Sequence, residues 1–234
     1  MNRYSKQKRL LVAVDCIIFG FDGSEMKILL IQRGFEPEKG KWSLVGGFIQ
    51  LKESLEDAAS RILNRLTGLD QIYMEQLHVF SKPTRDPIER TVSVAYFALL
   101  DLASYVHQLN PEFHAEWFPL HKLPRLIFDH NEMVQLARTK LRYKASLHPL
   151  LFELLPEKFT LPQLQNLFEQ IYQTSFDKRN FSRKVMSTGL LLKQNDKDKE
   201  SSKKGAFYYK LDKKHYTANF HNVLRLIPNP NGLL

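Results

Sequence analysis

Runs of apolar residues in the first half of the chain predict a β-rich region. Five segments have the length and the aliphatic or aromatic content of strands. They cover residues 10–21, 26–32, 42–45, 91–100 and 115–119. Helical spacing of apolar residues interrupts this series after the third segment and follows the fifth. The pattern predicts an α+β fold, an α/β sandwich in which helices pack on a mixed sheet.

Two helices are predicted in this first part. One begins after Ser54, where Ser54 and Asp57 are placed to cap it, and ends at Gly68. The apolar face predicted for it consists of Leu55, Ala59, Ile62 and Leu66. The other predicted helix covers residues 132–144. Both are expected to cover the sheet.

The last third of the chain has a different organisation. Thr160 and Gln163 have the spacing of a capping box before an amphipathic helix, and Asp177 is placed to cap a second helix. Two apolar segments separated by a charged loop follow, at residues 189–193 and 206–211. Helix, short turn, basic helix and hairpin predict a winged helix-turn-helix domain. We place it at residues 149–234, after a first domain at residues 1–148.

The net charge of +9 is concentrated in this second domain. Residues 1–149 hold 20 Lys and Arg against 17 Asp and Glu, whereas residues 150–234 hold 14 against 8. The basic residues gather on the second helix and the hairpin, which a winged helix presents to double-stranded DNA, so we expect DNA binding. The candidate contacts are Lys178, Arg179, Asn180, Ser182, Arg183, Lys184, Lys203 and Lys204. The alternative is a helical cap or oligomerisation domain with a charged surface.

Composition narrows the class of protein further. The only cysteine is Cys16, inside a predicted strand, which excludes an internal disulfide and fits a reducing cytoplasm. No apolar run approaches the ~20 residues of a membrane-spanning helix. No zinc-ligand spacing or phosphate-binding P-loop is visible, and no cofactor or metal is expected. We therefore expect a cytoplasmic protein without membrane contact.

One stretch has the spacing of a catalytic motif. Gly47, Glu53, Arg61 and the pair Gly68-Leu69 resemble the frame of a Nudix box. Working boxes carry glutamates at the three positions held here by Ile62, Arg65 and Leu66. Such glutamates share one helix face and bind divalent cations, which activate water at a pyrophosphate. Their absence predicts a domain that binds a ligand without hydrolysing it, and hence no enzyme.

The chain as a whole resembles the Nudix-related transcriptional regulators of bacteria. The resemblance extends to the segments 85–87, 90–96, 126–130 and 178–181, in that order. It favours the branch that represses arabinose-utilisation genes, whereas other branches control NAD biosynthesis and respond to ADP-ribose. The resemblance implies a homodimer formed through the Nudix-like domains, a near-palindromic operator, and a small-molecule effector in the former substrate pocket.

The candidate effector-binding residues are Asp15, Arg33, Trp42, Glu53, Asp86, Asp129 and His130. Asp86, Asp129 and His130 lie in segments that match this family, and Asp15, within an apolar strand, needs a polar partner if it is buried. Trp42 could stack on a sugar or be a buried sheet residue, and Arg33 could bind an anion or pair with Glu36 or Glu53. Arg61 is predicted to form an internal salt bridge with a nearby acid.

The predicted function is that of a repressor of a sugar-utilisation operon, with L-arabinose as the favoured effector. A regulator of NAD metabolism that senses ADP-ribose is the alternative, and four arginines, at positions 33, 61, 65 and 85, leave a diphosphate ligand open. An atypical Nudix hydrolase of nucleoside diphosphate derivatives is the competing class.

Overall fold

The computed structural model describes residues 7–102, 105, 109–147, 154–199 and 205–216. The chain divides into two compact units. The first comprises Met1–Phe19, Ile28–Ala98 and Tyr105–Ala137, and the second Gly20–Lys27, Leu99–Ser104 and Arg138–Leu234. No helix of the described residues is long and apolar enough to cross a membrane. The predicted boundary between residues 148 and 149 falls outside the described residues and stays a prediction.

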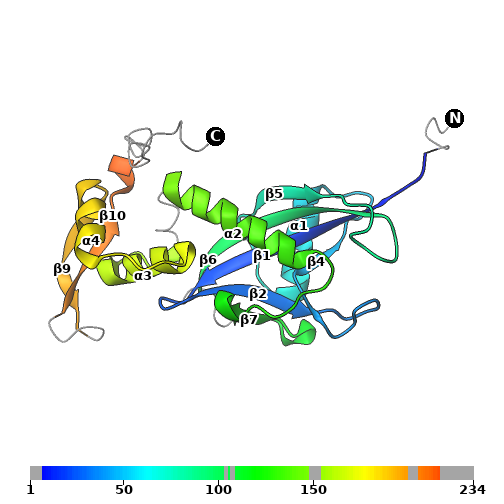
Figure 1. Cartoon of the computed structure of the whole chain (residues 1–234), viewed down its shortest axis with the longest axis horizontal. Coiled ribbons are helices and arrows are strands. Elements are labelled where there is room, and N and C mark those ends of the chain that lie inside the picture. Colours follow the sequence, from blue (N-terminus) through cyan, green and yellow to red (C-terminus); the bar gives the residue numbers. More distant parts are fainter. Residues whose placement is uncertain (1–6, 103–104, 106–108, 148–153, 200–204, 217–234) are drawn as a thin grey trace. The chain divides into compact units, whose positions relative to one another are not determined.

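A seven-stranded sheet forms the centre of the first unit (Figure 1). Its strands are β1 (Leu11–Phe21), β2 (Met26–Gln32), β3 (Trp42–Ser43), β4 (Val45–Phe48), β5 (Glu75–Phe80), β6 (Thr91–Asp101) and β7 (Glu116–Pro119). The order is β3-β2-β1-β6-β5, with β4 also paired to β1 and β7 to β2. Two short 3-10 helices, η2 (Pro111–Phe113) and η3 (Leu120–Lys122), flank β7. The predicted sandwich is confirmed.

Helices cover both faces of this sheet. In Figure 1, α1 (Leu55–Thr67) lies behind it and α2 (His130–Leu147) in front. Strand β1 is consequently buried at nine successive positions rather than at alternate ones. Cys16 is one of them, as predicted, and its burial raises the pKa of the thiol far above the ordinary value.

Helix α1 is bounded by the predicted caps. Ser54 and Asp57 form a capping box, and Gly68 takes the left-handed conformation with φ of 82°. The predicted apolar face is correct for Ala59 and Ile62, which are buried. It is wrong for Leu55 and Leu66, which are half-buried, because the helix faces the core through Ala58, Leu63 and Thr67 instead.

The second unit contains the predicted winged helix. Its elements are β8 (Phe159–Thr160), α3 (Leu161–Tyr172), α4 (Lys178–Ser187), β9 (Leu191–Asp198) and β10 (Ala206–Leu211). The strands form a sheet in the order β8-β10-β9. Thr160 and Gln163 form the expected capping box, and the Asp177 side chain accepts a hydrogen bond from the Asn180 backbone N–H. Phe181 of α4 packs edge-on against Phe168 of α3, with ring centroids 5.5 Å apart.

Strands β5 and β9 and helix α2 are among the elements that differ from the sequence prediction. Strand β5 was not predicted, because its polar residues leave it half-exposed and without a long apolar run. Strand β9 runs to Asp198, deep into the predicted charged loop, because pairing with β10 and packing on Phe207 stabilise it: the Nζ of Lys193 lies 3.7 Å from that ring's centroid. Helix α2 begins at His130, two residues earlier than expected.

Candidate functional site

The first unit contains a cavity of about 360 Å³, within the range of small-molecule sites. Its lining comes from strands β1 to β4 with the loop after β2, from α1 and η2, from the segment before β6 with the first residue of β6, and from the start of α2. Four of the predicted effector-binding residues line it: Asp15, Arg33, Asp86 and His130. The other three, Trp42, Glu53 and Asp129, do not.

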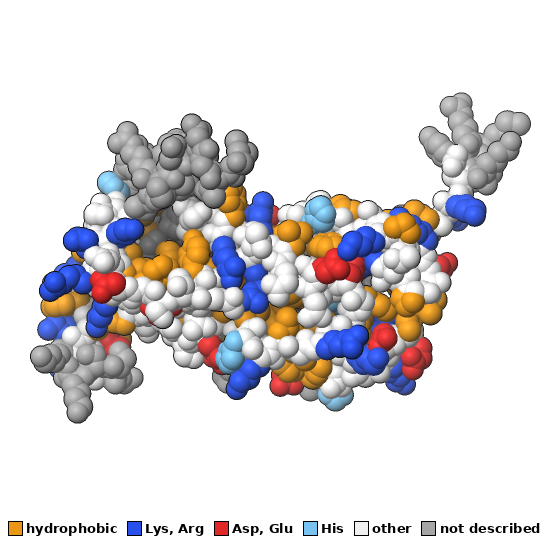
Figure 2. Space-filling model, viewed as in Figure 1, with side chains coloured by type: hydrophobic (Ala, Val, Ile, Leu, Met, Phe, Trp, Pro, Cys, Tyr) orange, Lys and Arg blue, Asp and Glu red, His pale blue; other side chains and the backbone are white. Residues whose placement is uncertain are grey.

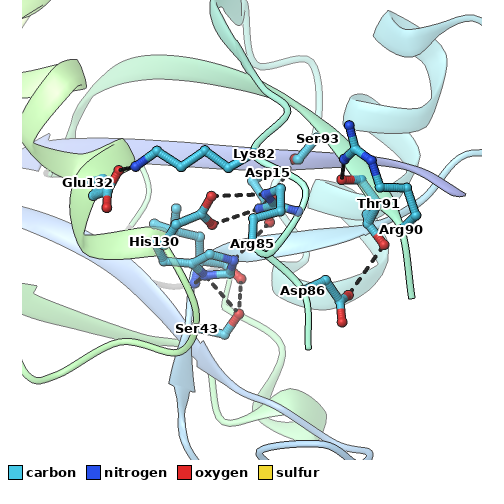
Figure 3. Close-up of polar contacts among 12 residues, drawn as sticks. Asp15, Ser43, Lys82, Arg85, Asp86, Arg90, Thr91, Ser93, His130 and Glu132 are labelled. Carbon is cyan, nitrogen blue, oxygen red and sulfur yellow. Dashed lines mark hydrogen bonds and ion pairs between the residues drawn. The ribbon is translucent and has the colours of Figure 1, made fainter. Parts of the chain in front are cut away.

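Asp15 is the centre of a buried polar network on one side of the cavity (Figure 3). Its Oδ2 accepts a hydrogen bond of 2.5 Å from Ser93 Oγ of β6 and lies 3.6 Å from Arg85 Nη2. Its Oδ1 lies 3.6 Å from His130 Nε2. A carboxylate within an apolar strand needs buried polar partners, and Ser93, Arg85 and His130 surround that of Asp15.

Arg85 joins Asp15 to a second carboxylate. The guanidinium donates from Nε and Nη2 to the two Asp129 oxygens at 2.9 and 2.8 Å, a bidentate pair. The Arg85 side chain is only 4% exposed. Asp129 therefore supports Arg85 from behind and has no surface on the cavity.

The tautomer of His130 follows from its neighbours. Nδ1 accepts a hydrogen bond of 3.2 Å from the Leu44 backbone N–H, so the proton of the neutral ring is on Nε2, facing Asp15. Burial lowers the pKa of His130, against the opposing influence of Asp15 and Asp129. The Nε2–H of His130 therefore faces the Asp15 carboxylate at 3.6 Å, and burial disfavours the charged form of the ring.

Arg33 also lines the cavity, where it lies against aromatic rings. Its guanidinium carbon is 3.9 Å from the centroid of Phe35 and 5.3 Å from that of Phe128. Burial lowers its pKa, although the nearby Asp86 acts in the opposite direction. The ring of Trp42 instead meets Phe118 edge-on at 4.6 Å, which agrees with its alternative interpretation as a packed sheet residue.

No pattern in the sequence predicts the aromatic part of the lining. Phe35, Phe48, Phe113 and Phe128 all contribute to the cavity. Phe35 and Phe48 are 55% and 43% exposed, which is high for large apolar side chains outside an interface. Phenylalanine in a polar loop was the only available signal, and it does not by itself indicate which residues meet.

The surviving acid of the Nudix-box frame is engaged in a salt bridge. Arg61 donates to Glu53 from Nε at 2.8 Å and from Nη2 at 2.5 Å, which confirms the predicted internal pair. Glu53 also accepts from the Gln50 backbone N–H at 2.6 Å. These bonds lower the pKa of Glu53. The pair fixes the loop before α1 to the helix.

The residues at the catalytic positions do not fit a divalent cation. Ile62 packs against Gly47, where a Cβ would lie 3.1 Å from its Cδ1, and Leu66 and Arg65 line the cavity. Glu56 accepts a hydrogen bond from Tyr96 Oη at 3.1 Å, on the side of the helix away from the lining. Within the described ranges, no group of three or more His, Cys, Asp or Glu could hold a metal ion.

The predicted DNA-binding residues of α4 form an exposed basic surface in the second unit. Lys178, Arg179, Asn180, Arg183 and Lys184 are exposed and Ser182 is half-buried. Figure 2 shows Lys and Arg side chains gathered over α4 and β9. Arg183 Nη2 donates to Asn180 Oδ1 at 2.8 Å, which orients the guanidinium. Lys203 and Lys204 lie outside the described residues.

Comparison with known proteins shows which of the candidate protein families this chain belongs to. Residues 9–137 match the family model of the NUDIX domain, and residues 151–211 match that of the NrtR DNA-binding winged helix domain. An ADPR responsive transcriptional repressor of Acinetobacter baylyi is 35% identical over 218 residues, which cover 92% of this chain and 87% of the relative. The chain belongs to the NrtR family of Nudix-related transcriptional regulators.

Solved structures of another NrtR protein, from Shewanella oneidensis, are similar over the same regions. Its complex with a 27mer DNA has a TM-score of 0.74 and 32% identity, covering 88% of this chain and 95% of that one. Its NUDIX domain in complex with ADP ribose has a TM-score of 0.53 and 35% identity, covering 60% and 94%. The predicted Nudix-like fold with a C-terminal winged helix is confirmed.

A third relative of this NrtR-family chain is an enzyme. An ADP-ribose pyrophosphatase of Methanocaldococcus jannaschii is 35% identical over 136 residues, which cover 58% of this chain and 77% of the relative. None of these comparisons supports the arabinose branch that the sequence analysis favoured. They agree with its alternative, the branch that responds to ADP-ribose.

Proposed function

We propose that this chain is a transcriptional repressor whose Nudix domain binds ADP-ribose and whose winged helix binds operator DNA. The observation that carries the effector is the composition of the cavity. It combines four arginines with aromatic rings and a buried carboxylate network, and two of these arginines, Arg33 and Arg65, form no ion pair among the described residues. ADP-ribose has a diphosphate for cations, an adenine for aromatic rings and ribose hydroxyls for carboxylates.

A neutral pentose fits this cavity less well. L-arabinose would need hydroxyl partners and one aromatic platform, and it would leave guanidinium groups without an anion. The relatives point the same way, since one is named for its response to ADPR and another is solved with ADP ribose. ADP-ribose therefore replaces L-arabinose as the proposed effector.

On the DNA side, the proposed contacts are made by α4. Its exposed basic residues are placed as in winged helices, in which the second helix enters the major groove. We propose a homodimer on a near-palindromic operator, because two-fold protein symmetry requires two half-sites. ADP-ribose binding would then release the operator.

Hydrolysis is the second candidate function, because an ADP-ribose pyrophosphatase is among the relatives. Pyrophosphate hydrolysis at a Nudix box needs acids that bind a cation, and Ile62, Arg65 and Leu66 stand at those positions. The proposed repressor therefore has no hydrolytic role. Purified protein with ADP-ribose and magnesium should yield no AMP by chromatography, with an active Nudix hydrolase as the positive control.

The function is tested by fluorescence anisotropy with labelled DNA from upstream of the protein's own operon. We expect binding that resists competitor DNA, is released by ADP-ribose and is unaffected by L-arabinose. Release by L-arabinose alone would overturn the proposed effector. Absence of preference for any fragment of the upstream region would overturn the proposed role as a repressor.

A further inference from the structure

We propose that Arg65 supplies, from the protein itself, the positive charge that a divalent cation supplies in a working Nudix site. The effector's diphosphate would then be bound without any metal ion. This inference rests on the proposed function and adds to it the way in which the anionic part of the ligand is recognised.

The four arginines of the cavity are not equivalent. The guanidinium of Arg33 donates from Nε to the Phe35 backbone oxygen at 3.1 Å and lies over the Phe35 ring. Arg85 is committed to Asp129 by two hydrogen bonds and lies beside Asp15. Arg61 is committed to Glu53, again by two hydrogen bonds. Both guanidinium groups have their charge offset by a carboxylate at hydrogen-bond distance, so they contribute more to the shape of the cavity than to anion binding.

Arg65, in contrast, has no carboxylate partner among the residues that the structure describes. It is exposed, lines the cavity, and makes no hydrogen bond or ion pair with any residue in the described part of the chain. It lies four residues after Arg61 and therefore one turn further along the same face of α1. A free guanidinium thus points into the space where an anionic ligand would be bound.

The surroundings of Arg65 disfavour a metal ion and favour a phosphate. Ile62 fills the neighbouring position against Gly47, and Leu66 adds an apolar surface, so no oxygen ligand is available there. A second cation beside Arg65 would be repelled. A guanidinium has five N–H donors in a planar fork and matches two phosphate oxygens at once.

The acidic residues around α1 explain why Arg65 would replace a metal ion rather than accompany one. The surviving acids of the α1 region are all engaged elsewhere: Glu53 with Arg61, Glu56 with Tyr96, and Asp57 with Ser54. None of the three lines the cavity. The charge at this wall of the cavity therefore comes from arginine alone.

The experiment is isothermal titration calorimetry of the full chain with ADP-ribose, once in EDTA and once in magnesium chloride. We expect the affinity of the unmodified protein to change less than about 2-fold between the two buffers. Arg65→Gln should weaken binding roughly 10- to 100-fold in both, the usual cost of a lost hydrogen bond between charged groups. Arg65→Lys should be intermediate, and Arg65→Glu weaker than Arg65→Gln.

Lys122→Gln is the matched control. It removes one positive charge from an exposed residue of the same unit that does not line the cavity, and it should leave the affinity unchanged. Because Arg65 is exposed, all three substitutions there should preserve folding, which thermal unfolding followed by circular dichroism checks.

The outcomes separate this inference from the proposed function. Binding that is lost in EDTA and restored by magnesium would overturn the role of Arg65 while leaving the ADP-ribose effector intact. Equal affinities of Arg65→Gln and the unmodified protein would do the same. No binding of ADP-ribose in either buffer would overturn the proposed effector, and the inference with it.

Discussion

Asp15 of β1 and Gly46 of β4 are paired across the sheet, and the Asp15 carboxylate fills the space in which a side chain at position 46 would lie. A Cβ at that position would overlap Asp15 Oδ1, the atom that faces the N–H of His130. Glycine at position 46 is therefore a condition for the buried network beside the cavity.

Replacing this glycine should destabilise the protein. Gly46→Ala forces Asp15 away from Ser93 and His130, and we expect a loss of about 2 kcal/mol or more in the free energy of unfolding, as for other overpacked sites. Chemical denaturation measures this loss. Gly34→Ala is the control, since a Cβ there would meet nothing within 4 Å, and a similar loss in that variant would refute the explanation.

The Arg85–Asp129 salt bridge should contribute far more to stability than an exposed salt bridge with the same N···O distance. Arg85→Gln leaves two buried carboxylates without their cation, and we expect a loss of roughly 3–5 kcal/mol. Lys82 and Glu132 are also 2.8 Å apart, but their side chains are 69% and 60% exposed. Lys82→Gln should cost less than about 1 kcal/mol. The two losses are measured by urea denaturation. Similar losses for Arg85→Gln and Lys82→Gln would contradict the expectation that burial makes the Arg85–Asp129 pair more important for stability.

His130 should make stability depend on pH in the weakly acidic range. Its pKa is lowered by burial from an ordinary 6.5, so below pH 6.5 the unfolded chain binds a proton that the folded protein does not. The contribution of His130 to the free energy of unfolding is therefore present above pH 6.5. It is lost as the pH falls, by at most about 1.4 kcal/mol per pH unit for one proton.

The measurement compares the unmodified protein with His130→Asn by denaturation between pH 8 and pH 5. An asparagine oxygen can still accept the Leu44 N–H but does not titrate in this range. The stability of the unmodified protein relative to the variant should decrease on acidification. A constant difference across the range would show that His130 is not protonated on unfolding.

Arg183 should determine specificity for one operator position. Its guanidinium is exposed on α4 and oriented by Asn180, and arginine can donate two hydrogen bonds to a guanine. Arg183→Ala should cost roughly 1–3 kcal/mol and relax the preference at that base pair. Lys204→Ala, at a residue predicted to lie in the hairpin, should instead weaken binding to all DNA alike and reduce its salt dependence. Anisotropy titrations on single-base operator variants distinguish the two patterns.

The elements that could be predicted from sequence are those whose determinants are local. The caps formed by Ser54, Thr160 and Asp177 each join side chains and backbone groups three residues apart. The Arg61–Glu53 pair spans eight residues across one loop. Strand β5 was missed because its residues are half-exposed, so its place depends on pairing with β6 rather than on its own composition.

The sequence by itself determined the two kinds of domain, the caps at which α1, α3 and α4 begin, the loss of the acids from the Nudix box, and the basic character of α4, because spacing and residue type express all of these along the chain. Only the tertiary structure decided which polar residues meet. Asp15, Arg85 and His130 are separated by up to 115 positions and are brought together by β1, the segment before β6 and the start of α2. Such a network depends on the pairing of distant strands, which no local pattern encodes.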